Sequence, residues 1–478
     1  MPQIRKAVVV LLSLLLASSC ALGPDFERPE PAVPAAYKGD ISGSQAITNL
    51  KWWQLYQDPV LQDLVRTALR NNQDLAAAAA RIEEASAVLG FTRADLYPSL
   101  GAAGSISRNE FKNPARDPEE RRGYSLSAVL SWEPDIWGKY RRASEAARAE
   151  MRASEYFYRA ATLSLVARVA NAYFLILDLD NRIAIASRTL QSRRKSTEII
   201  QARFDKGYVS KLDLYQAQVE EQSAAVAVFS FTRQLKYAEN ALSILLGRLP
   251  GDIPRSQSLE TRKLLPAVPT GMPSELLQRR PDVLAAEELL HAQMARIGVA
   301  QALRFPSISL SAAFGIETLA FSSLNLDRDQ FWSIGGDLFG PVLSADRNVS
   351  RVEVEKARTK QLALAYESTV LNAFREVEDS IAAVNTFASE YEARAFQVEA
   401  GRNASILSRA RYDAGETSYL EVLDTERSLF RDELAESEAL RNRFNSLVQL
   451  YMVLGGGWEA ESSSNADANS NVPAQTTN

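Results

Sequence analysis

The 478-residue sequence contains one cysteine, one histidine and five methionines. A single cysteine excludes an intrachain disulfide framework, and a single histidine leaves little material for a zinc cluster or a Cys/His dyad. That histidine, His291, lies within a helical pattern and is typical of an ordinary surface or packed histidine. With no nucleophile or metal constellation in view, the sequence does not predict an enzyme.

The chain also lacks an excess of positive charge. Its formal net charge is −5, with 54 Lys and Arg against 59 Asp and Glu. Binding to nucleic acid requires a basic surface, so nucleic acid is not an expected partner.

The chain contains an internal repeat, which sets the expected architecture. Residues 411–427 (RYDAGETSYLEVLDTER) repeat the pattern of residues 203–214 (RFDKGYVSKLDL), 208 positions later. Two further anchors share this offset: residues 96–100 with 304–308, and 69–74 with 277–282. We therefore predict two halves of roughly two hundred residues, duplicated in tandem.

Each copy of the repeated motif predicts a helical hairpin. A helix ends at a glycine able to take positive φ, Gly207 or Gly415, and a serine, Ser210 or Ser418, precedes the next helix as its cap.

The first twenty residues predict a secretory signal. Arg5 and Lys6 precede a short apolar run, which is too short to span a membrane, and small residues then lead to Cys20. This arrangement resembles a bacterial lipoprotein signal, in which Cys20 carries covalent lipid as the mature N-terminus. The alternative is an incidental Cys20 with cleavage elsewhere.

The rest of the first half reads as an arm, a helix and two strands. Residues 23–59 are rich in Pro, Gly and Ser and end in an Asp58-Pro59 helix start, and the apolar spacing predicts one long helix over 60–96. Strand-like runs follow at 99–111 and 124–134, separated by a charged loop over 112–123.

The second run alternates apolar residues with small polar ones over about ten residues, which suits a transmembrane β-strand. A strand of a soluble sandwich would show the same alternation. In the second half, the runs at about 307–317 and 331–343 repeat the pattern.

Two helical patterns are too long for a compact soluble core. From Lys139 to Gly207 no proline or glycine intervenes, and a second helical pattern of similar length runs over 348–412. At 1.5 Å per residue each is about 100 Å long, so it belongs to a coiled-coil rod or to the wall of a tube. A shorter helical pattern follows each of them, at 212–246 and at 418–454, and returns in the opposite direction over roughly half the length.

The predicted organisation has six parts. They are a signal peptide (1–19), a lipidated extended arm (20–59), a first repeat (60–248), a linker (249–273), a second repeat (274–455) and a disordered tail (456–478).

Four membrane strands cannot close a barrel, because closure needs eight or more strands and an open edge cannot face lipid. The chain must therefore oligomerise. Two copies would give eight strands with a filled interior, whereas three would give twelve strands with room for a pore. The residues alone do not choose between these two states.

The layout resembles the TolC-like outer-membrane efflux channels, in particular their lipoprotein branch. The resemblance covers nearly the whole chain. It rests on the repeated hairpin motif and on residues 20–29 (CALGPDFERP), 131–139 (SWEPDIWGK), 279–282 (RRPD) and 305–307 (FPS). At Asp346 the family usually has a glycine, which concerns only the local turn.

The resemblance implies a mixed α and β membrane protein that forms a homotrimer. Its twelve-stranded barrel, with four strands per protomer, would lie in the outer membrane and continue as a helical tunnel through the periplasm. Such channels act as the exit duct of a tripartite pump, with a periplasmic adaptor protein and an inner-membrane transporter of the RND type as partners. No cofactor is implied beyond covalent lipid on Cys20.

The resemblance also implies a gate at the periplasmic tip. Leu420 and Asp424 take the constricting positions, Arg427 and Tyr412 take part in the polar contacts that close the tip, and Asp213 is the matching polar residue of the first repeat. A ring of carboxylates would repel itself, which gives a nearby Arg427 a physical purpose. The alternative for Asp424 is a solvated helix face paired with Arg427.

The leading functional hypothesis is a passive duct for drugs or other small toxic compounds. A duct for heavy metals or for secreted proteins has the same architecture, although the few methionines and the single histidine give no sign of a soft-metal path. A structural coiled-coil lipoprotein is the rival of another class, but such a rod has no need for four alternating strands.

Overall fold

The computed structural model describes residues 21–31, 33–38, 58–113, 116–261, 273–319, 321, 325–341 and 346–456. Cys20 and the tail from 457 onward lie outside these residues. The chain divides into two compact units, and each takes residues from both halves of the sequence. Unit 1 contains residues 1–30, 80–155 and 285–368, and unit 2 contains 31–79, 156–284 and 369–478.

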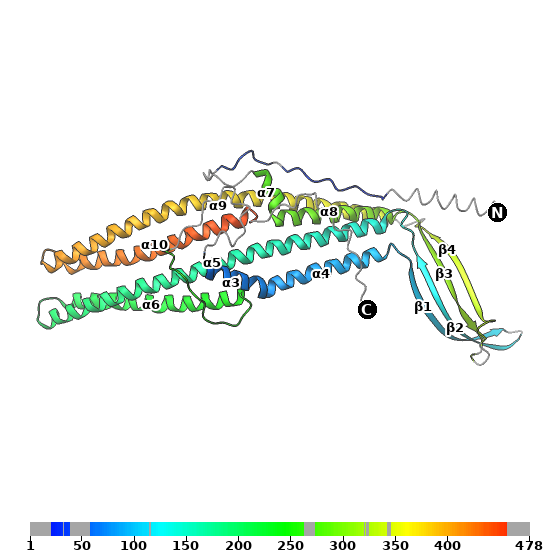
Figure 1. Ribbon diagram of the computed structural model, residues 1–478, viewed down its shortest axis with the longest axis horizontal. Coiled ribbons are helices and arrows are strands. Elements are labelled where there is room, and N and C mark those ends of the chain that lie inside the picture. The colour runs from blue at the N-terminus through cyan, green and yellow to red at the C-terminus, as the bar shows by residue number, and fades with distance from the viewer. Residues whose placement is uncertain are drawn as a thin grey trace. The chain divides into compact units, whose positions relative to one another are not determined.

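The helices and strands follow one another in two similar series, labelled in Figure 1. The first series is α3 (Pro59–Asn71), α4 (Gln73–Ala94), β1 (Ser99–Asn113), β2 (Arg116–Trp132), α5 (Lys139–Asp205) and α6 (Lys211–Leu245). The second is α7 (Pro273–Arg279), α8 (Pro281–Ala302), β3 (Ser307–Thr318), β4 (Gln330–Phe339), α9 (Arg347–Asp413) and α10 (Tyr419–Val453).

The long helices agree with the sequence prediction. Both α5 and α9 have 67 residues, and both α6 and α10 have 35. At 1.5 Å per residue, α5 and α9 are each about 100 Å long. The corresponding long helices begin 208 residues apart, as Lys139 and Arg347 do.

The prediction of one continuous helix over 60–96 is wrong, because the chain leaves the helical conformation at Asn72. Asn72 has φ −67° and ψ 127°. Its side-chain oxygen accepts a hydrogen bond from the Leu75 amide at 3.0 Å, and its side-chain nitrogen donates to the Leu245 carbonyl at 3.0 Å. The second half breaks at the corresponding Arg280, since Pro281 disfavours a helical residue before it.

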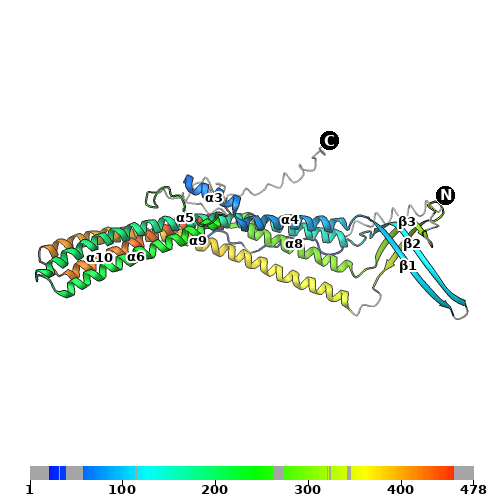
Figure 2. The same cartoon turned by 90° about the horizontal axis from the view of Figure 1, so that it is seen from below.

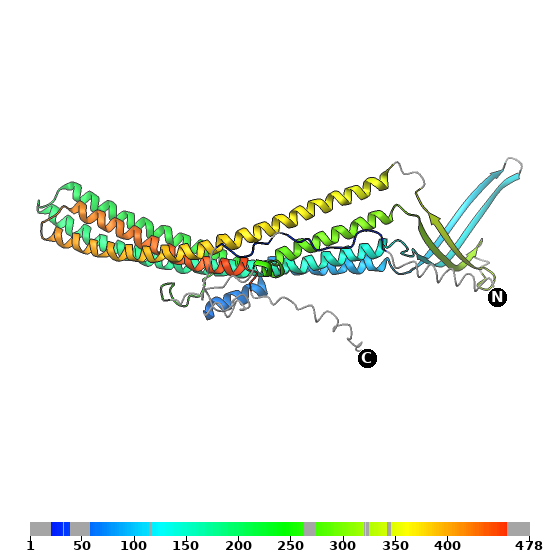
Figure 3. The same ribbon diagram turned by 90° about the horizontal axis from the view of Figure 1, so that it is seen from above.

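Unit 1 contains an antiparallel sheet of four strands in the order β1-β2-β3-β4. The sheet twists, and its two hairpins diverge toward their turns (Figure 3). The loop predicted over 112–123 is mostly strand instead: β1 runs to Asn113 and β2 starts at Arg116. Backbone pairing tolerates charged residues, and Pro118 lies where the register shifts, so it interrupts no regular hydrogen bond.

The other strand ends differ by a few residues from the predicted ones. β2 ends at Trp132 rather than 134, and the indole of Trp132 donates to the Leu96 carbonyl at 3.1 Å. β4 ends at Phe339 rather than 343, where Gly340 and Pro341 follow.

The two faces of the sheet differ as the alternation predicts. One face is apolar: Leu100, Leu130, Ala312 and Ile334 are successive cross-strand neighbours. The opposite face carries mainly Ser, Gly and Ala, with Ser99, Ser131, Ser311 and Gly335 in one row. The Ser99 and Ser131 hydroxyls are 2.7 Å apart, which satisfies both without a charge.

Unit 2 contains the main apolar core and both helical hairpins. The turns between α5 and α6 and between α9 and α10 lie at the same end of this unit (Figures 1 and 2). Tyr173, Phe174, Leu242 and Phe444 are buried together, and the rings of Phe174 and Phe444 are 5.2 Å apart. α3 adds Leu61 and Val65 to this core. As predicted, Asp58 precedes the start of α3 at Pro59 and caps it, because its carboxylate accepts a hydrogen bond from the Val60 amide.

Among the described helices, α5 is long and apolar enough to cross a membrane, with an 18-residue stretch of mean hydropathy 1.6. Half of that stretch is buried within the protein. Val169, Tyr173 and Ile176 of α5 are fully buried in the core of unit 2, so we assign α5 as a core helix.

Candidate functional site at the hairpin turns

The first hairpin turn is built as the sequence predicts. Gly207 has φ 80°, and the Tyr208 amide donates to the Arg203 carbonyl at 2.9 Å, which closes the end of α5. Ser210 then caps α6: its hydroxyl accepts the Asp213 amide, and the Asp213 carboxylate accepts the Ser210 amide at 3.0 Å. The structure therefore places the predicted gate residue Asp213 in a capping box.

The second turn has the same backbone and different side-chain contacts. Gly415 has φ 77°, and the Glu416 amide donates to the Arg411 carbonyl. Ser418 occupies the cap position but makes no side-chain capping bond, so its predicted role is wrong in that detail. Glu421 takes over the local contacts, because it accepts hydrogen bonds from Thr417 and from Arg411.

An apolar cluster joins the two hairpins behind these turns. It consists of Ile200, Leu214, Ala217, Tyr419, Val422 and Leu423, from α5, α6 and α10. Burial raises the pKa of the Tyr419 hydroxyl to about 12, with the Glu426 charge adding to the effect.

Tyr412 covers one side of this cluster. Its ring lies 5.4 Å from the ring of Tyr419, and the Arg203 guanidinium lies over it at 5.1 Å. The Tyr412 hydroxyl is buried and has no hydrogen-bond partner among the described residues.

The other predicted gate residues lie on the exposed surface of α10. Leu420 is 56% exposed although it is apolar. Asp424 is exposed, and no hydrogen bond or ion pair joins it to any residue in the described part of the chain. The structure thus does not bring Asp424 and Arg427 together within one chain.

Arg427 instead contacts Glu220, a residue that the sequence analysis missed. The Arg427 Nε atom lies 2.6 Å from Glu220 Oε1. Glu220 also accepts Arg193 from α5, at 3.0 Å to its carboxylate and 2.8 Å to its backbone carbonyl. Burial lowers the pKa of Arg193, against the opposing charge of Glu220.

A second set of polar contacts lies beside this one. Arg409 of α9 donates to Glu426 at 2.6 Å and to Ser196 at 2.7 Å, and the hydroxyls of Ser408 and Thr425 are 2.7 Å apart. Three helices are therefore tied by charge-assisted hydrogen bonds that water partly reaches. No group of three or more His, Cys, Asp or Glu residues in the described ranges could hold a metal ion.

A chain that joins a sheet with one apolar face to two long helical hairpins defines a class: a subunit of an outer-membrane channel. The family described as outer membrane efflux protein matches residues 64–248 and 272–456. The chain belongs to this family, and it serves as the outer-membrane exit duct of an efflux system, extending into the periplasm.

Several known proteins are similar over almost their whole length. The chain is 36% identical to the outer membrane protein OprJ of Pseudomonas aeruginosa, covering 95% of this chain and 96% of that one. It is 33% identical to the toluene efflux pump outer membrane protein TtgC of Pseudomonas putida, covering 98% and 99%. It is 32% identical to the cation efflux system protein CusC of Escherichia coli, covering 93% and 97%.

Solved structures show the same fold. The CmeC outer membrane channel of Campylobacter jejuni has a TM-score of 0.87 at 27% identity, covering 93% of this chain and 96% of that chain. A membrane protein of Pseudomonas aeruginosa has a TM-score of 0.85 at 35% identity, covering 91% and 100%.

Proposed function

We propose that three copies of the chain form the duct, with a twelve-stranded barrel made of four strands from each. The unpaired edges of the sheet carry this proposal. Within the described residues, β1 pairs only with β2 and β4 only with β3, so each edge of the sheet has free backbone donors and acceptors. In lipid those groups must be satisfied, and a neighbouring copy can supply the missing strand.

An exposed apolar row on α6 supports contact between copies along the helices. It consists of Leu212, Tyr215, Val219, Val226 and Phe229, which are each at least half exposed. Their spacing follows a heptad pattern, which is the pattern of residues that pack between helices in a coiled coil.

A tandem duplication explains why two halves of one chain supply equivalent strands and helices. The family match falls on two segments that start 208 residues apart, at 64 and 272. In a trimer this duplication gives six similar units around the pore.

The duct is proposed to carry drugs or other small toxic compounds. Relatives are described as efflux proteins for toluene, for antibiotics and for solvents. The face of the sheet rich in Ser, Gly and Ala would line the lumen, and a lining of small neutral residues suits passage without tight binding. The alternative cargoes are heavy-metal ions, since a relative is described as a cation efflux protein, or secreted proteins.

The proposed partners are a periplasmic adaptor and an inner-membrane transporter of the RND type, with covalent lipid on Cys20 as an anchor in the outer membrane. The duct itself is passive and catalyses no reaction. Its constriction is proposed to involve Leu420, Asp424, Arg427, Tyr412 and Asp213. Support comes from Asp424, whose carboxylate is exposed and has no partner among the described residues, so it is free to contact other copies.

Deleting the gene and measuring what accumulates tests the cargo. We expect the deletion strain to retain hydrophobic dyes and solvents, and the wild-type gene to restore efflux. Unchanged dye retention together with new sensitivity to copper or silver would favour the heavy-metal duct. Loss of a secreted protein from the medium would favour the third cargo class.

A further inference from the structure

We propose that a cavity at the helix end of the sheet binds the phosphate group of a membrane glycerophospholipid, with Arg351 as the main cation that recognises it. The cavity has a volume of about 230 Å³ and lies within unit 1, where β2 leads into α5, α8 leads into β3, and α9 begins. The proposal requires the outer-membrane location of the chain, and it does not depend on the number of copies in the channel.

The cavity lies at the level where the apolar face of the sheet begins. Ile308, which lines the cavity, pairs with Leu338 at the start of that face. Three aromatic residues line it as well: Phe339, and Trp137 and Phe305, whose rings stack at 4.7 Å. Aromatic residues mark the edges of the apolar band in membrane barrels. Because the helices extend into the periplasm, this edge meets the periplasmic leaflet, whose lipids are glycerophospholipids.

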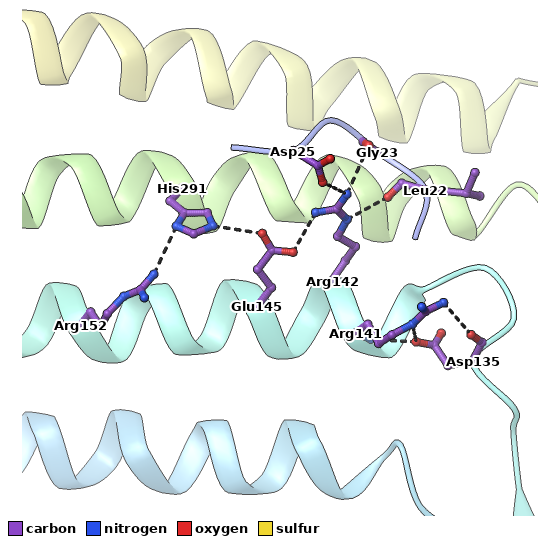
Figure 4. A network of polar contacts seen from close by, with 9 residues as sticks. All are labelled: Leu22, Gly23, Asp25, Asp135, Arg141, Arg142, Glu145, Arg152 and His291. Carbon is purple, nitrogen blue, oxygen red and sulfur yellow. Dashed lines mark hydrogen bonds and ion pairs between the residues drawn. The ribbon is translucent and has the colours of Figure 1, made fainter. Parts of the chain in front are cut away.

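The two carboxylates of the cavity already have partners. Glu133 accepts hydrogen bonds from Lys139 at 2.6 Å and from the Tyr140 hydroxyl at 3.0 Å. Asp135 accepts the backbone amides of Tyr140 and Arg141, and Figure 4 shows the Arg141 guanidinium bound to the same carboxylate. Each carboxylate oxygen thus has a donor within the segment that joins β2 to α5, so neither group is left to pair with a cation from α9.

Arg351 is the cation of this cavity that has no carboxylate partner. Within the described ranges its guanidinium forms no ion pair, and a long hydrogen bond of 3.5 Å joins it to the Asn348 side chain. Arg142, in the first turn of α5, differs because Asp25 and Glu145 hold it at 2.7 and 2.8 Å (Figure 4). A guanidinium presents a planar set of donors that matches phosphate oxygens, so Arg351 is suited to a phosphate.

Lys139 brings a second positive charge to the same cavity. Its ammonium has three N–H donors, and Glu133 accepts one of them. Burial opposes the charge of Lys139, but the hydrogen bonds to Glu133 and Tyr140 outweigh burial and raise its pKa, so the group stays protonated. A phosphate in the cavity therefore meets two cations, of which Arg351 is unpaired.

The apolar surface beside the cavity favours a lipid over a soluble phosphate. Leu310 and Leu338 lie next to it on the apolar face of the sheet and are 41% and 73% exposed. The cavity can take a phosphate with its glycerol, and the acyl chains would lie along this exposed face, where their burial is favourable. Ala143 stands 208 positions before Arg351, so the first half has no equivalent cation and each chain should have one such site.

Native mass spectrometry of the delipidated protein in detergent tests the site, with dioleoyl phosphatidylglycerol as the added probe. The wild type should bind one lipid per chain tightly, and Arg351→Gln should weaken this binding about ten-fold, because a charge-assisted hydrogen bond to the phosphate is lost. Arg351→Lys keeps the charge and should recover part of the affinity. Lys360→Gln removes an exposed cation of the same helix that has no contact among the described residues, so this control should bind like the wild type.

Two further probes separate the phosphate from the acyl chains. Dioleoylglycerol has the chains without the phosphate and should bind equally weakly to the wild type and to Arg351→Gln. Glycerophosphoglycerol has the phosphate diester without the chains and should not displace the lipid at equal concentration.

Equal affinity of the wild type and Arg351→Gln for phosphatidylglycerol would overturn the proposal, and so would an equal loss of affinity in Lys360→Gln. Full displacement of the lipid by glycerophosphoglycerol or by inorganic phosphate would show that the ligand is a soluble phosphate and would overturn the lipid. Because Arg351 is exposed, these variants should keep the strand content of the wild type, which circular dichroism of the same samples measures.

Discussion

Arg427 of α10 and Glu220 of α6 are separated by 207 residues in the sequence, and their side chains form a hydrogen bond of 2.6 Å. Glu220 binds Arg193 of α5 at the same time, so one buried carboxylate ties three helices together. Arg193 is 4% exposed at its side chain, whereas Arg427 is 44% exposed. Loss of the Arg193 pair should therefore lower the free energy of unfolding more than loss of the Arg427 pair.

Glu220→Gln should destabilise the hairpins much more than Arg427→Gln. The first change leaves the buried Arg193 charge without its anion, which costs about 3–5 kcal/mol. The second removes a solvent-exposed partner and should cost about 1 kcal/mol or less. Thermal unfolding followed by helical circular dichroism checks the order. Glu221→Gln, next to Glu220 and paired with a mainly exposed Arg194, is the control. Equal decreases in the unfolding temperature for Glu220→Gln and Glu221→Gln would show that Glu220 contributes no more to stability than its neighbour.

Much of this fold could be predicted because local rules determine it. Helix length followed from the absence of proline and glycine between Lys139 and Gly207, and the hairpin turns followed from Gly207 and Gly415. The apolar face and the small polar face of the sheet followed from the alternation of these residue types along each strand. Such features depend on residues close together in the sequence, so a single sequence shows them directly.

Contacts between distant residues could not be predicted in this way. Glu220 has no counterpart in the repeat, since Ser428 stands 208 positions later, so the repeat gave no signal for the ion pair with Arg427. Similarly, nothing local marks Arg142 as the partner of Leu22 and Asp25. At the break at Asn72, the local bond to the Leu75 amide is joined by a bond to the Leu245 carbonyl across the fold, and the apolar spacing of 60–96 shows neither.

Replacing Asp424 should open the proposed constriction. In a trimer the exposed Asp424 carboxylates and the Leu420 side chains would face each other, and Arg427 would supply charge-assisted hydrogen bonds worth about 1.5–3 kcal/mol each. The double change Asp424→Ala and Arg427→Ala should weaken the closed state and raise single-channel conductance in a planar bilayer.

Single changes separate the two contributions, because Arg427 is already engaged by Glu220. Asp424→Ala alone should raise conductance without loss of thermal stability. Glu399→Ala, which removes an exposed carboxylate of α9, should leave conductance unchanged. Wild-type conductance in the double variant, with assembly preserved, would place the constriction elsewhere.

Asp346 is the only described residue other than glycine with positive φ, at 57°. It stands where the first half has Gly138, which has φ 77°. A β-branched side chain is disfavoured in this region, so Asp346→Val should lower the free energy of unfolding by about 1–2 kcal/mol, whereas Asp346→Gly should be neutral or slightly stabilising. Denaturant unfolding gives the ranking. A valine variant as stable as the glycine variant would show that the turn relaxes freely.

Tyr419 should make the hairpin ends sensitive to high pH. Its pKa is raised from 10.0 to about 12 in the folded chain, so the unfolded chain releases the proton first. The stability is fully present below pH 10 and falls as pH rises from 10 toward 12. The tyrosinate absorbance of the wild type minus that of Tyr419→Phe isolates the Tyr419 hydroxyl, and this difference should titrate near pH 12. A difference titration near 10 would show that this hydroxyl is exposed.

The central claim is that the open sheet edges of one chain are completed by two neighbours. Native mass spectrometry of the protein extracted from outer membranes counts the copies directly, and circular dichroism of the same sample reports the strand content. The account predicts a single species of three processed chains with full strand content. A monomer or a dimer with the same strand content would contradict it.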